Sequence, residues 1–252
     1  MIRMENVEMC YSGGVKALCR TSIEFHPGSF TVLLGPSGAG KSTLLRCLNL
    51  LNCPTTGKVI VEGFGELPGN RKLLRQHRCR TAMIFQQHQL IPRHSALRNV
   101  LIGRVGEYGT LRSLFPLPKH EYEFALDCLD RVQLLDKALE RADNLSGGQQ
   151  QRVGIARALA QKPHLILADE PVASLDPATA DKVLALIHRI IKEDHITAIV
   201  SIHQVDLALK YADRIIGLSE GRIVFDDTPQ SASRTTLQSI YRAAEEVTPK
   251  AA

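Results

Sequence analysis

The sequence predicts an α/β fold in which a mixed sheet has flanking helices and an inserted helical segment. Three observations lead to this prediction. An apolar strand runs into a glycine-rich loop and a helix at residues 30–51. A second alternation of apolar strands and helices occupies residues 165–203. Between these two parts, residues 87–154 carry helical patterns and no strong strand, which is typical of a helical insertion into an α/β core.

Composition places the chain among ordinary globular proteins. Its 252 residues are 44% hydrophobic and 23% charged, which allows a sizeable core in one or two domains. Aromatic residues make up only 5%, so aromatic stacking is not expected to be the main mode of binding. There is no apolar run of about 18 residues and no signal-peptide core, so we expect a cytoplasmic chain. The six cysteines lack metal-site or C-x-x-C spacing, and we expect reduced thiols.

The first part of the chain predicts strands around one helix. Four leucines at helical spacing, in residues 44–51, indicate a helix directly after the glycine-rich loop. Apolar residues alternate or cluster between turn signals in the expected strands, which are residues 1–8, 21–25, 30–35, 58–63 and 81–86.

A basic run at residues 71–80 raises the question of an acidic partner. The net charge of +5 permits contact with an acidic surface. The run is either a nucleic-acid patch or the solvated face of a helix, and we favour the helix face. We therefore expect no nucleic acid among the partners.

Beyond residue 87 the pattern becomes helical and then returns to α/β. Asp176 is a plausible N-cap for a helix that has Pro177 in its first turn. The other expected elements are helices at 95–103 and 121–135, strands at 164–170 and 196–203, and a terminal hairpin at 213–227. We expect a core of residues 1–86 and 155–228, a helical subdomain of residues 87–154, and a tail of residues 229–252.

The glycine-rich loop fits the pattern G-x-x-x-x-G-K-[ST], and its place between a strand and a helix supports a phosphate site. Glycines let the backbone N–H groups face phosphate oxygens, and the helix N-terminus adds a favourable dipole. Lys41 can reach the terminal phosphates of a nucleotide, and Tyr11 is a candidate for stacking on adenine. The residues of the loop expected to bind the nucleotide are Gly35, Pro36, Ser37, Gly38, Ala39, Gly40, Lys41, Ser42 and Thr43.

Polar residues end three of the predicted strands. Asp169 and Glu170 close one strand, at the edge of a parallel sheet where ligands bind. Glu170 suits a general base that deprotonates an attacking water. His203 and Gln86 end other strands, from which they can reach the terminal phosphate and a bound Mg²⁺ or water. We take Glu170, His203 and Gln86 as catalytic candidates, and Ser42, Gln86 and Asp169 as Mg²⁺ ligands.

A second glycine-rich turn, with the sequence NLSGGQQQR at residues 144–152, precedes another predicted helix. One nucleotide needs only one phosphate cradle, so this turn requires a different explanation.

The order of these motifs resembles that of ABC-transporter nucleotide-binding subunits. The matching features are the phosphate loop, Gln86, LSGGQ, LILADEP, SLD and His203, and few other ATPases share LSGGQ. The resemblance runs from residue 2 to about residue 229. It implies a P-loop ABC ATPase core with antiparallel N-terminal strands, a nucleotide-binding domain of residues 1–228, hydrolysis of ATP, and Mg²⁺ as cofactor.

The same resemblance explains the second turn. In this family two subunits stack head to tail, and each ATP lies between the phosphate loop of one copy and LSGGQ of the other. The residues implied to reach the partner copy's nucleotide are Ser146, Gly147, Gly148, Gln149 and Asp176. Two transmembrane permease subunits are also implied, with a periplasmic solute-binding protein as an indirect partner. The chain would then lie on the cytoplasmic face of the inner membrane.

Longer matching stretches, such as NVLIGRVG and ADEPVASLDP, resemble the ATP-binding subunits of phosphonate importers most closely. Phosphite importers use similar subunits, and the solute does not touch this chain, so both solutes stay open. A soluble ABC ATPase that acts on DNA or ribosomes is a further alternative. DNA-repair relatives carry a coiled-coil insertion for which the interval between Lys41 and Ser146 leaves no room, and ribosome-acting relatives usually carry two cassettes.

Overall fold

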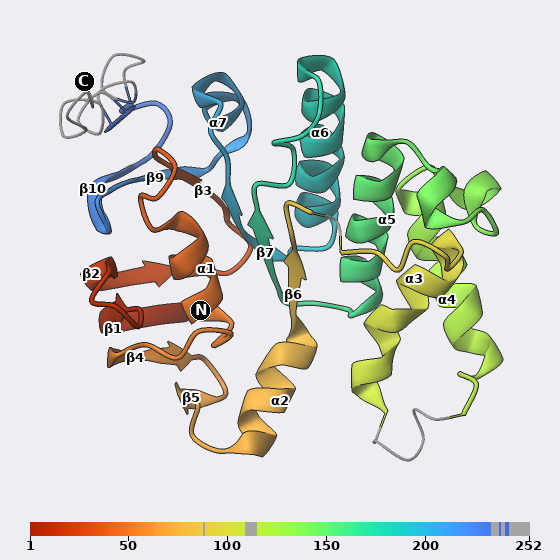
Figure 1. The fold of residues 1–252 in the computed structure, drawn as a ribbon, viewed down its shortest axis with the longest axis horizontal. Helices are drawn as coiled ribbons and strands as arrows, with labels where there is room; N and C mark the ends of the chain where they lie inside the picture. The colour runs from red at the N-terminus through yellow and green to blue at the C-terminus, as the bar shows by residue number, and fades with distance from the viewer. Residues whose placement is uncertain (88, 109–114, 233–236, 238–239, 242–252) are drawn as a thin grey trace.

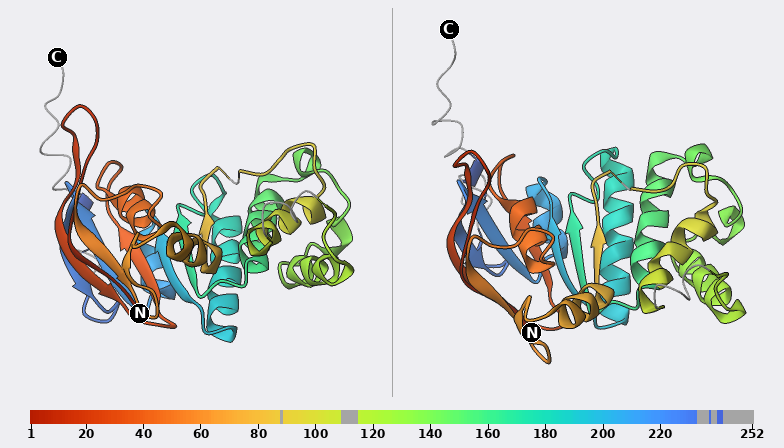
Figure 2. Two further views of the ribbon diagram at one scale, coloured as in Figure 1. Left: turned by 90° about the horizontal axis from the view of Figure 1, so that it is seen from below. Right: turned by 60° about the horizontal axis from the view of Figure 1, so that its bottom comes forward.

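The computed structural model describes all residues except 88, 109–114, 233–236, 238–239 and 242–252. It contains a four-stranded sheet of order β2-β1-β4-β5 and a six-stranded sheet of order β10-β9-β3-β8-β7-β6. Figure 2 shows the red and orange N-terminal sheet at one end of the molecule and the yellow and green helices at the other. The expected mixed α/β architecture with antiparallel N-terminal strands is confirmed.

The four-stranded sheet is antiparallel throughout. It consists of β1 (Ile2–Cys10), β2 (Lys16–Phe25), β4 (Thr56–Val61) and β5 (Gly65–Leu67). Three of these strands were expected from their apolar alternation. The short β5 was not predicted, because three residues between glycine-rich turns carry too little pattern to identify a strand.

The six-stranded sheet is parallel except at one edge. Its parallel strands are β3 (Phe30–Leu34), β6 (Thr81–Ile84), β7 (Leu165–Asp169), β8 (Thr197–Ser201) and β9 (Arg214–Ser219). The antiparallel β10 (Arg222–Asp227) pairs with β9, which confirms the terminal hairpin. The carboxyl ends of parallel strands lie along the same side of the sheet. The segments that follow β3, β6, β7 and β8 therefore meet there.

Helices cover both faces of this sheet (Figure 1). Helix α1 (Lys41–Leu48) lies between the two sheets, while α5 (Gly147–Ala160), α6 (Pro177–Glu193) and α7 (Val205–Tyr211) pack on the other face. The side chains of β3 divide accordingly. Leu33 packs with the cluster around α1, and Val32 and Leu34 pack with the cluster around α6, as the two-residue period of a strand requires.

In its described residues, the expected helical segment contains α3 (Ala96–Leu101), α4 (Lys119–Arg131) and the short 3₁₀ helices η1 (Ile102–Glu107), η3 (Leu135–Lys137) and η4 (Ala142–Asn144). Residues 109–114, between η1 and α4 in the chain, lie outside the described residues. Helix α5 continues across residue 155, where the sequence suggested a return to the core. The division of the chain at that residue stays a prediction.

The basic run forms helix α2 (Arg71–Arg80), as we favoured, and the side chain of Asn70 caps its N-terminus. Two of its arginines donate hydrogen bonds to backbone carbonyls of the same chain. Arg75 bonds the carbonyls of Gly106 and Tyr108, and Arg78 bonds those of Asn49 and Leu50. All six cysteines are free thiols. Within the described ranges, no helix has the length and apolar character that crossing a bilayer requires.

Candidate functional site

The phosphate loop joins β3 to α1 and lies tightly against neighbouring backbone. Gly35 has φ +151 and Gly40 has φ +102, conformations that favour glycine. A Cβ atom at Gly35 would lie 2.2 Å from the carbonyl oxygen of Leu218, and one at Gly40 would lie 2.6 Å from that of Ala17. Glycine is therefore required at both ends of the loop, because any side chain would collide with backbone that cannot move aside.

Lys41, the first residue of α1, is buried beneath the loop and only 4% exposed. Its Nζ donates hydrogen bonds to the carbonyl oxygens of Gly35 at 2.7 Å and Pro36 at 2.9 Å. Burial lowers the pKa of Lys41, and the nearby carboxylates of Glu170 and Asp169 oppose this effect. The ammonium lies 4.0 Å from Oε1 of Glu170, so the loop and the acids after β7 form one site.

Asp169 is the centre of a buried cluster of oxygen atoms. Its Oδ1 accepts hydrogen bonds from the hydroxyl of Ser42 at 2.7 Å and from that of Ser201 at 3.1 Å. Sheet pairing creates the second contact, because Asp169 and Ser201 lie opposite each other on β7 and β8. Nη2 of Arg46 lies 3.9 Å from Oδ2. The Ser42 proton points to Asp169, so the lone pairs of that hydroxyl are available to a hard cation such as Mg²⁺.

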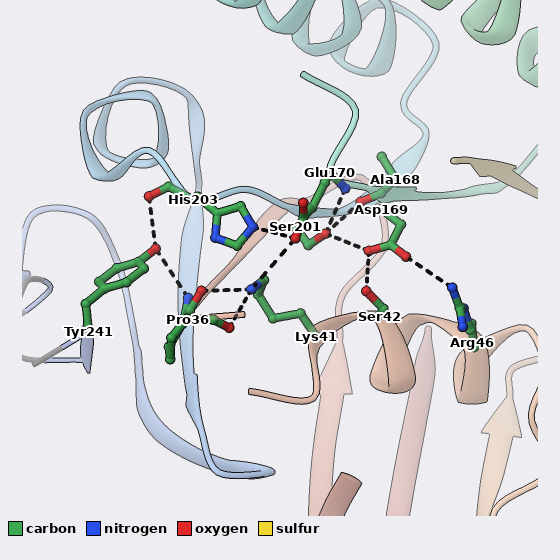
Figure 3. A network of polar contacts seen from close by, with 11 residues as sticks. Pro36, Lys41, Ser42, Arg46, Ala168, Asp169, Glu170, Ser201, His203 and Tyr241 are labelled. Atoms are coloured by element: carbon green, nitrogen blue, oxygen red, sulfur yellow. Dashed lines mark hydrogen bonds and ion pairs between the residues drawn. The ribbon is translucent and has the colours of Figure 1, made fainter. Parts of the chain in front are cut away.

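Glu170 has an unusual backbone conformation for a residue other than glycine, with φ +49. Its N–H donates a hydrogen bond of 2.9 Å to the Ser201 hydroxyl, which holds this turn in place. Oε1 of the carboxylate lies 2.5 Å from Nε2 of His203. Figure 3 shows the converging side chains, which are Lys41, Ser42, Asp169, Glu170, Ser201 and His203. The structure therefore brings together the sequence-predicted acids, lysine and histidine.

Two predicted site residues lie at the margin of this cluster. Gln86 is exposed just after β6, at the same edge of the sheet, and no hydrogen bond joins it to Asp169 or Ser42 in the described part of the chain. Tyr11 is 36% exposed in the turn between β1 and β2. Its hydroxyl lies 3.3 Å from Oγ1 of Thr43 and accepts a 2.6 Å hydrogen bond from Asn52. Tyr11 thus flanks the helix that follows the phosphate loop.

The second glycine-rich turn caps helix α5. The Ser146 hydroxyl accepts a hydrogen bond from the Gln149 N–H at 3.3 Å, and the Gln149 side chain accepts one from the Ser146 N–H at 2.8 Å. This reciprocal pair is a capping box. A Cβ atom at Gly148 would lie 2.9 Å from Cγ2 of Thr179, so glycine permits the close approach of α5 and α6. The cap therefore depends on the local sequence, whereas glycine at position 148 is needed for the packing of α5 against α6.

A surface groove of about 900 Å³ borders this turn. Asp176 lies in it, caps α6 by accepting a 3.0 Å hydrogen bond from the Thr179 N–H, and has its pKa lowered by its hydrogen bonds with Thr179. The four turn residues line the groove, which are Ser146, Gly147, Gly148 and Gln149. No residue of the phosphate loop lines it. The groove beside the second turn and the phosphate loop are therefore separate places on the chain.

Three residues of the cluster were missed by sequence reasoning. Ser201 is a polar residue that ends an apolar strand, so the signal that identified His203 could have identified it too. Arg46 reaches Asp169 from helix α1 and has no distinguishing motif. The Tyr241 hydroxyl donates a 3.0 Å hydrogen bond to the backbone carbonyl of His203, although it lies in the C-terminal tail, where the sequence shows little pattern.

Comparisons with known proteins agree along most of the chain. A family model described as ABC transporter matches residues 18–173. The phosphonates import ATP-binding protein PhnC 3 of Nostoc sp. is 60% identical over 247 residues, covering 98% of this chain and 94% of that protein. The phosphite import ATP-binding protein PxtA of Stutzerimonas stutzeri is 62% identical over 241 residues, covering 96% of this chain and 87% of that protein.

Solved structures show the same fold. An ATP-binding cassette, solved as a dimer in a post-hydrolysis state bound to ADP and Pi, is 34% identical with a TM-score of 0.80. The match covers 92% of this chain and 100% of that one. The cbiO1 protein of Clostridium perfringens, described as part of an ABC transporter complex, is 27% identical with a TM-score of 0.82 and covers 99% of this chain and 96% of that one.

Proposed function

The chain belongs to the ABC transporter family, and on this premise we propose that it hydrolyses ATP to drive the uptake of phosphonates as the ATP-binding subunit of an importer. One observation carries the proposal. Lys41 and Ser42 of the phosphate loop share one sheet edge with Asp169, Glu170 and His203. A phosphate binder, a candidate Mg²⁺ site and a candidate base thus lie together, as hydrolysis of a nucleoside triphosphate requires.

The phosphate loop and Lys41 bind the β- and γ-phosphates of ATP. An ammonium group has three donors, and in the described structure carbonyl groups of the loop accept two of them. The third donor serves a phosphate oxygen. The Ser42 hydroxyl and the Asp169 carboxylate are hard oxygen donors that fit Mg²⁺, which offsets phosphate charge when bound. Gln86 borders the bound nucleotide beside the Mg²⁺ position, and Tyr11 borders it beside the adenine.

Glu170 is the general base. It accepts a proton from water while the water oxygen bonds to the γ-phosphorus and the bond to the bridging oxygen breaks. A positioned base contributes about 10²–10⁴ to the rate. His203 orients the carboxylate through its 2.5 Å contact and faces the γ-phosphate, and Ser201 fixes the backbone of Glu170 at 2.9 Å.

The groove beside the second glycine-rich turn binds the nucleotide of another copy of the chain. The groove beside Ser146 and Asp176 shares no residue with the phosphate loop, so it needs a nucleotide held elsewhere. Two copies arranged head to tail supply one. The amides of Gly147 and Gly148, at the positive end of the 14-residue helix α5, then face the γ-phosphate held by the partner. The solved cassette described as a dimer supports this arrangement.

Membrane partners complete the importer. We propose that two copies of the chain dock on two transmembrane permease subunits at the cytoplasmic face of the inner membrane, with a periplasmic solute-binding protein as the indirect source of solute. Relatives named for phosphonates import support this solute. A relative named for phosphite import is equally similar, so phosphite is the second candidate.

Growth on defined phosphorus sources tests the proposal. A strain lacking the gene should fail to grow on methylphosphonate and should grow normally on phosphate. The wild-type chain should restore growth, and Glu170→Gln should not. Growth defects on phosphite alone would assign the second solute. Normal growth of the deletion strain on both compounds would contradict a role in phosphorus import.

A further inference from the structure

The described helical residues near the C-terminus lie beside the candidate site. They are Leu237, Ile240 and Tyr241, and we call them the C-terminal segment. Leu237 and Ile240 are 0% and 5% exposed and belong to the core cluster that contains β3 and β8. Tyr241 follows directly and packs partly buried against the same cluster. The described residues of this segment are helical, and their spacing of three and four places all three side chains on one face. Leu237 and Ile240 are therefore part of the core.

Strand β9 accommodates Ile240 at a glycine, Gly217. An ideal Cβ atom at Gly217 would lie 2.4 Å from Cδ1 and 3.3 Å from Cγ1 of Ile240. The same atom would lie 3.0 Å from Cβ of Phe225. Gly217 thus leaves the space that Ile240 fills, and this contact fixes the position of Tyr241.

The Tyr241 hydroxyl joins two parts of the candidate site (Figure 3). It accepts a 3.4 Å hydrogen bond from the N–H of Gly35, the first residue of the phosphate loop. It donates a 3.0 Å hydrogen bond to the carbonyl oxygen of His203. Burial raises the pKa of Tyr241, so the hydroxyl keeps the proton that it donates at neutral pH.

His203 needs such support because of its place in the chain. Strand β8 ends at Ser201, and α7 begins at Val205, so His203 lies in the connection between them. The last ladder bond of this region joins the Ile202 N–H to the Leu33 carbonyl at 3.1 Å. Beyond that point the Tyr241 hydroxyl holds the backbone of His203, whose imidazole contacts Glu170.

We propose that Tyr241 is a positioning residue, which ties the start of the phosphate loop to the backbone of His203 and so sets the geometry of the Glu170–His203 pair. The C-terminal segment then controls the rate of hydrolysis without touching ATP. This inference rests on the proposed ATPase function. It assigns Tyr241 an effect on turnover that ring packing alone would not produce.

The test is Tyr241→Phe, which removes the hydroxyl and keeps the ring. ATP hydrolysis is measured for the full chain assembled with its membrane subunits in vesicles. We expect kcat to fall about five- to tenfold, as the loss of roughly one net hydrogen bond from the transition-state geometry implies. The KM for ATP should change little, because the hydroxyl does not touch the phosphates. The melting temperature of the purified chain should fall by only a few degrees, because the N–H of Gly35 and the carbonyl of His203 each lose one partner.

Tyr211→Phe is the matched control. The Tyr211 hydroxyl also makes a hydrogen bond within the chain, of 2.9 Å to the carboxylate of Asp181. Asp181 lies on α6, away from the Glu170–His203 pair. Its kcat should equal that of the wild type. An unchanged kcat in Tyr241→Phe would overturn the inference, as would an equal loss in Tyr211→Phe or a loss explained by a lower melting temperature. A wild-type complex that does not hydrolyse ATP would instead refute the proposed function.

Discussion

Replacing Ser201 by alanine tests how the general base is held. Ser201 is fully buried, and its hydroxyl has two functional partners. It accepts the Glu170 N–H at 2.9 Å and donates to Asp169 Oδ1 at 3.1 Å. Glu170 has a left-handed backbone, which costs about 1–2 kcal/mol for a residue other than glycine. Without the hydroxyl, the turn loses the contact that offsets this cost.

The size of the effect follows from these contacts. A buried N–H left without a partner costs about 1–3 kcal/mol. For a chain of this size, each kcal/mol lowers the melting temperature by about 2–4 °C. Relaxation of the turn also moves the Glu170 carboxylate away from His203. If about 1.4 kcal/mol of that loss appears in the transition state, kcat falls about tenfold. KM for ATP should stay within about twofold of its wild-type value, because the phosphate loop keeps its own contacts.

Steady-state hydrolysis and thermal unfolding, measured on the same preparations, separate the two effects. Thr31→Val is the control, since it removes another fully buried hydroxyl, at the opposite end of β3 from the phosphate loop. It should leave kcat unchanged. A Ser201→Ala chain with a lower melting temperature and wild-type kcat would show that Ser201 stabilises the fold without positioning Glu170, and would refute this reasoning.

Lys41→Ala should weaken ATP binding about 10- to 100-fold, since charge-assisted hydrogen bonds contribute about 1.5–3 kcal/mol, and titration calorimetry would detect unaltered affinity as the contrary result. A pH dependence is expected from Glu121, whose pKa is held below its ordinary value of 4.5 mainly by its hydrogen bond with Arg104. A lowered folded-state pKa adds stability above the unfolded-state value, and this stability disappears as the pH falls through the folded-state pKa. Glu121→Gln should therefore lower the melting temperature at pH 7 and flatten its decline toward pH 4; an acid dependence identical to the wild type would contradict this assignment.

The sequence predicts the parts of the site whose chemistry needs fixed local spacing. The loop from Gly35 to Ser42 must wrap phosphates within one turn. Its glycines and lysine therefore have a fixed spacing that can be recognised in the sequence alone. Asp169, Glu170 and His203 were predictable because polar residues at the ends of apolar strands stand out. The capping role of Asp176 was predictable because it depends only on neighbouring residues. The cap of Ser146 is equally local, although it was not predicted from the sequence.

Contacts that depend on the assembled fold could not be predicted from the sequence. Tyr241 and Gly35 are separated by 206 residues, and no local sequence pattern indicates their hydrogen bond. Ser201 reaches Asp169 only because β7 and β8 pair in one particular register. Strand β5 was missed for a different reason, since its three residues are too few to show a period.

The central claim is that each copy of the chain completes the nucleotide site of another. Light scattering of the Glu170→Gln variant, which should bind ATP and hydrolyse it slowly, measures this directly. The account predicts that saturating ATP converts the 27.8 kDa chain to a particle of twice that mass, and that Ser146→Arg in the same variant prevents the conversion. A mass that stays at 27.8 kDa while ATP is bound, both alone and beside the membrane subunits, would contradict it.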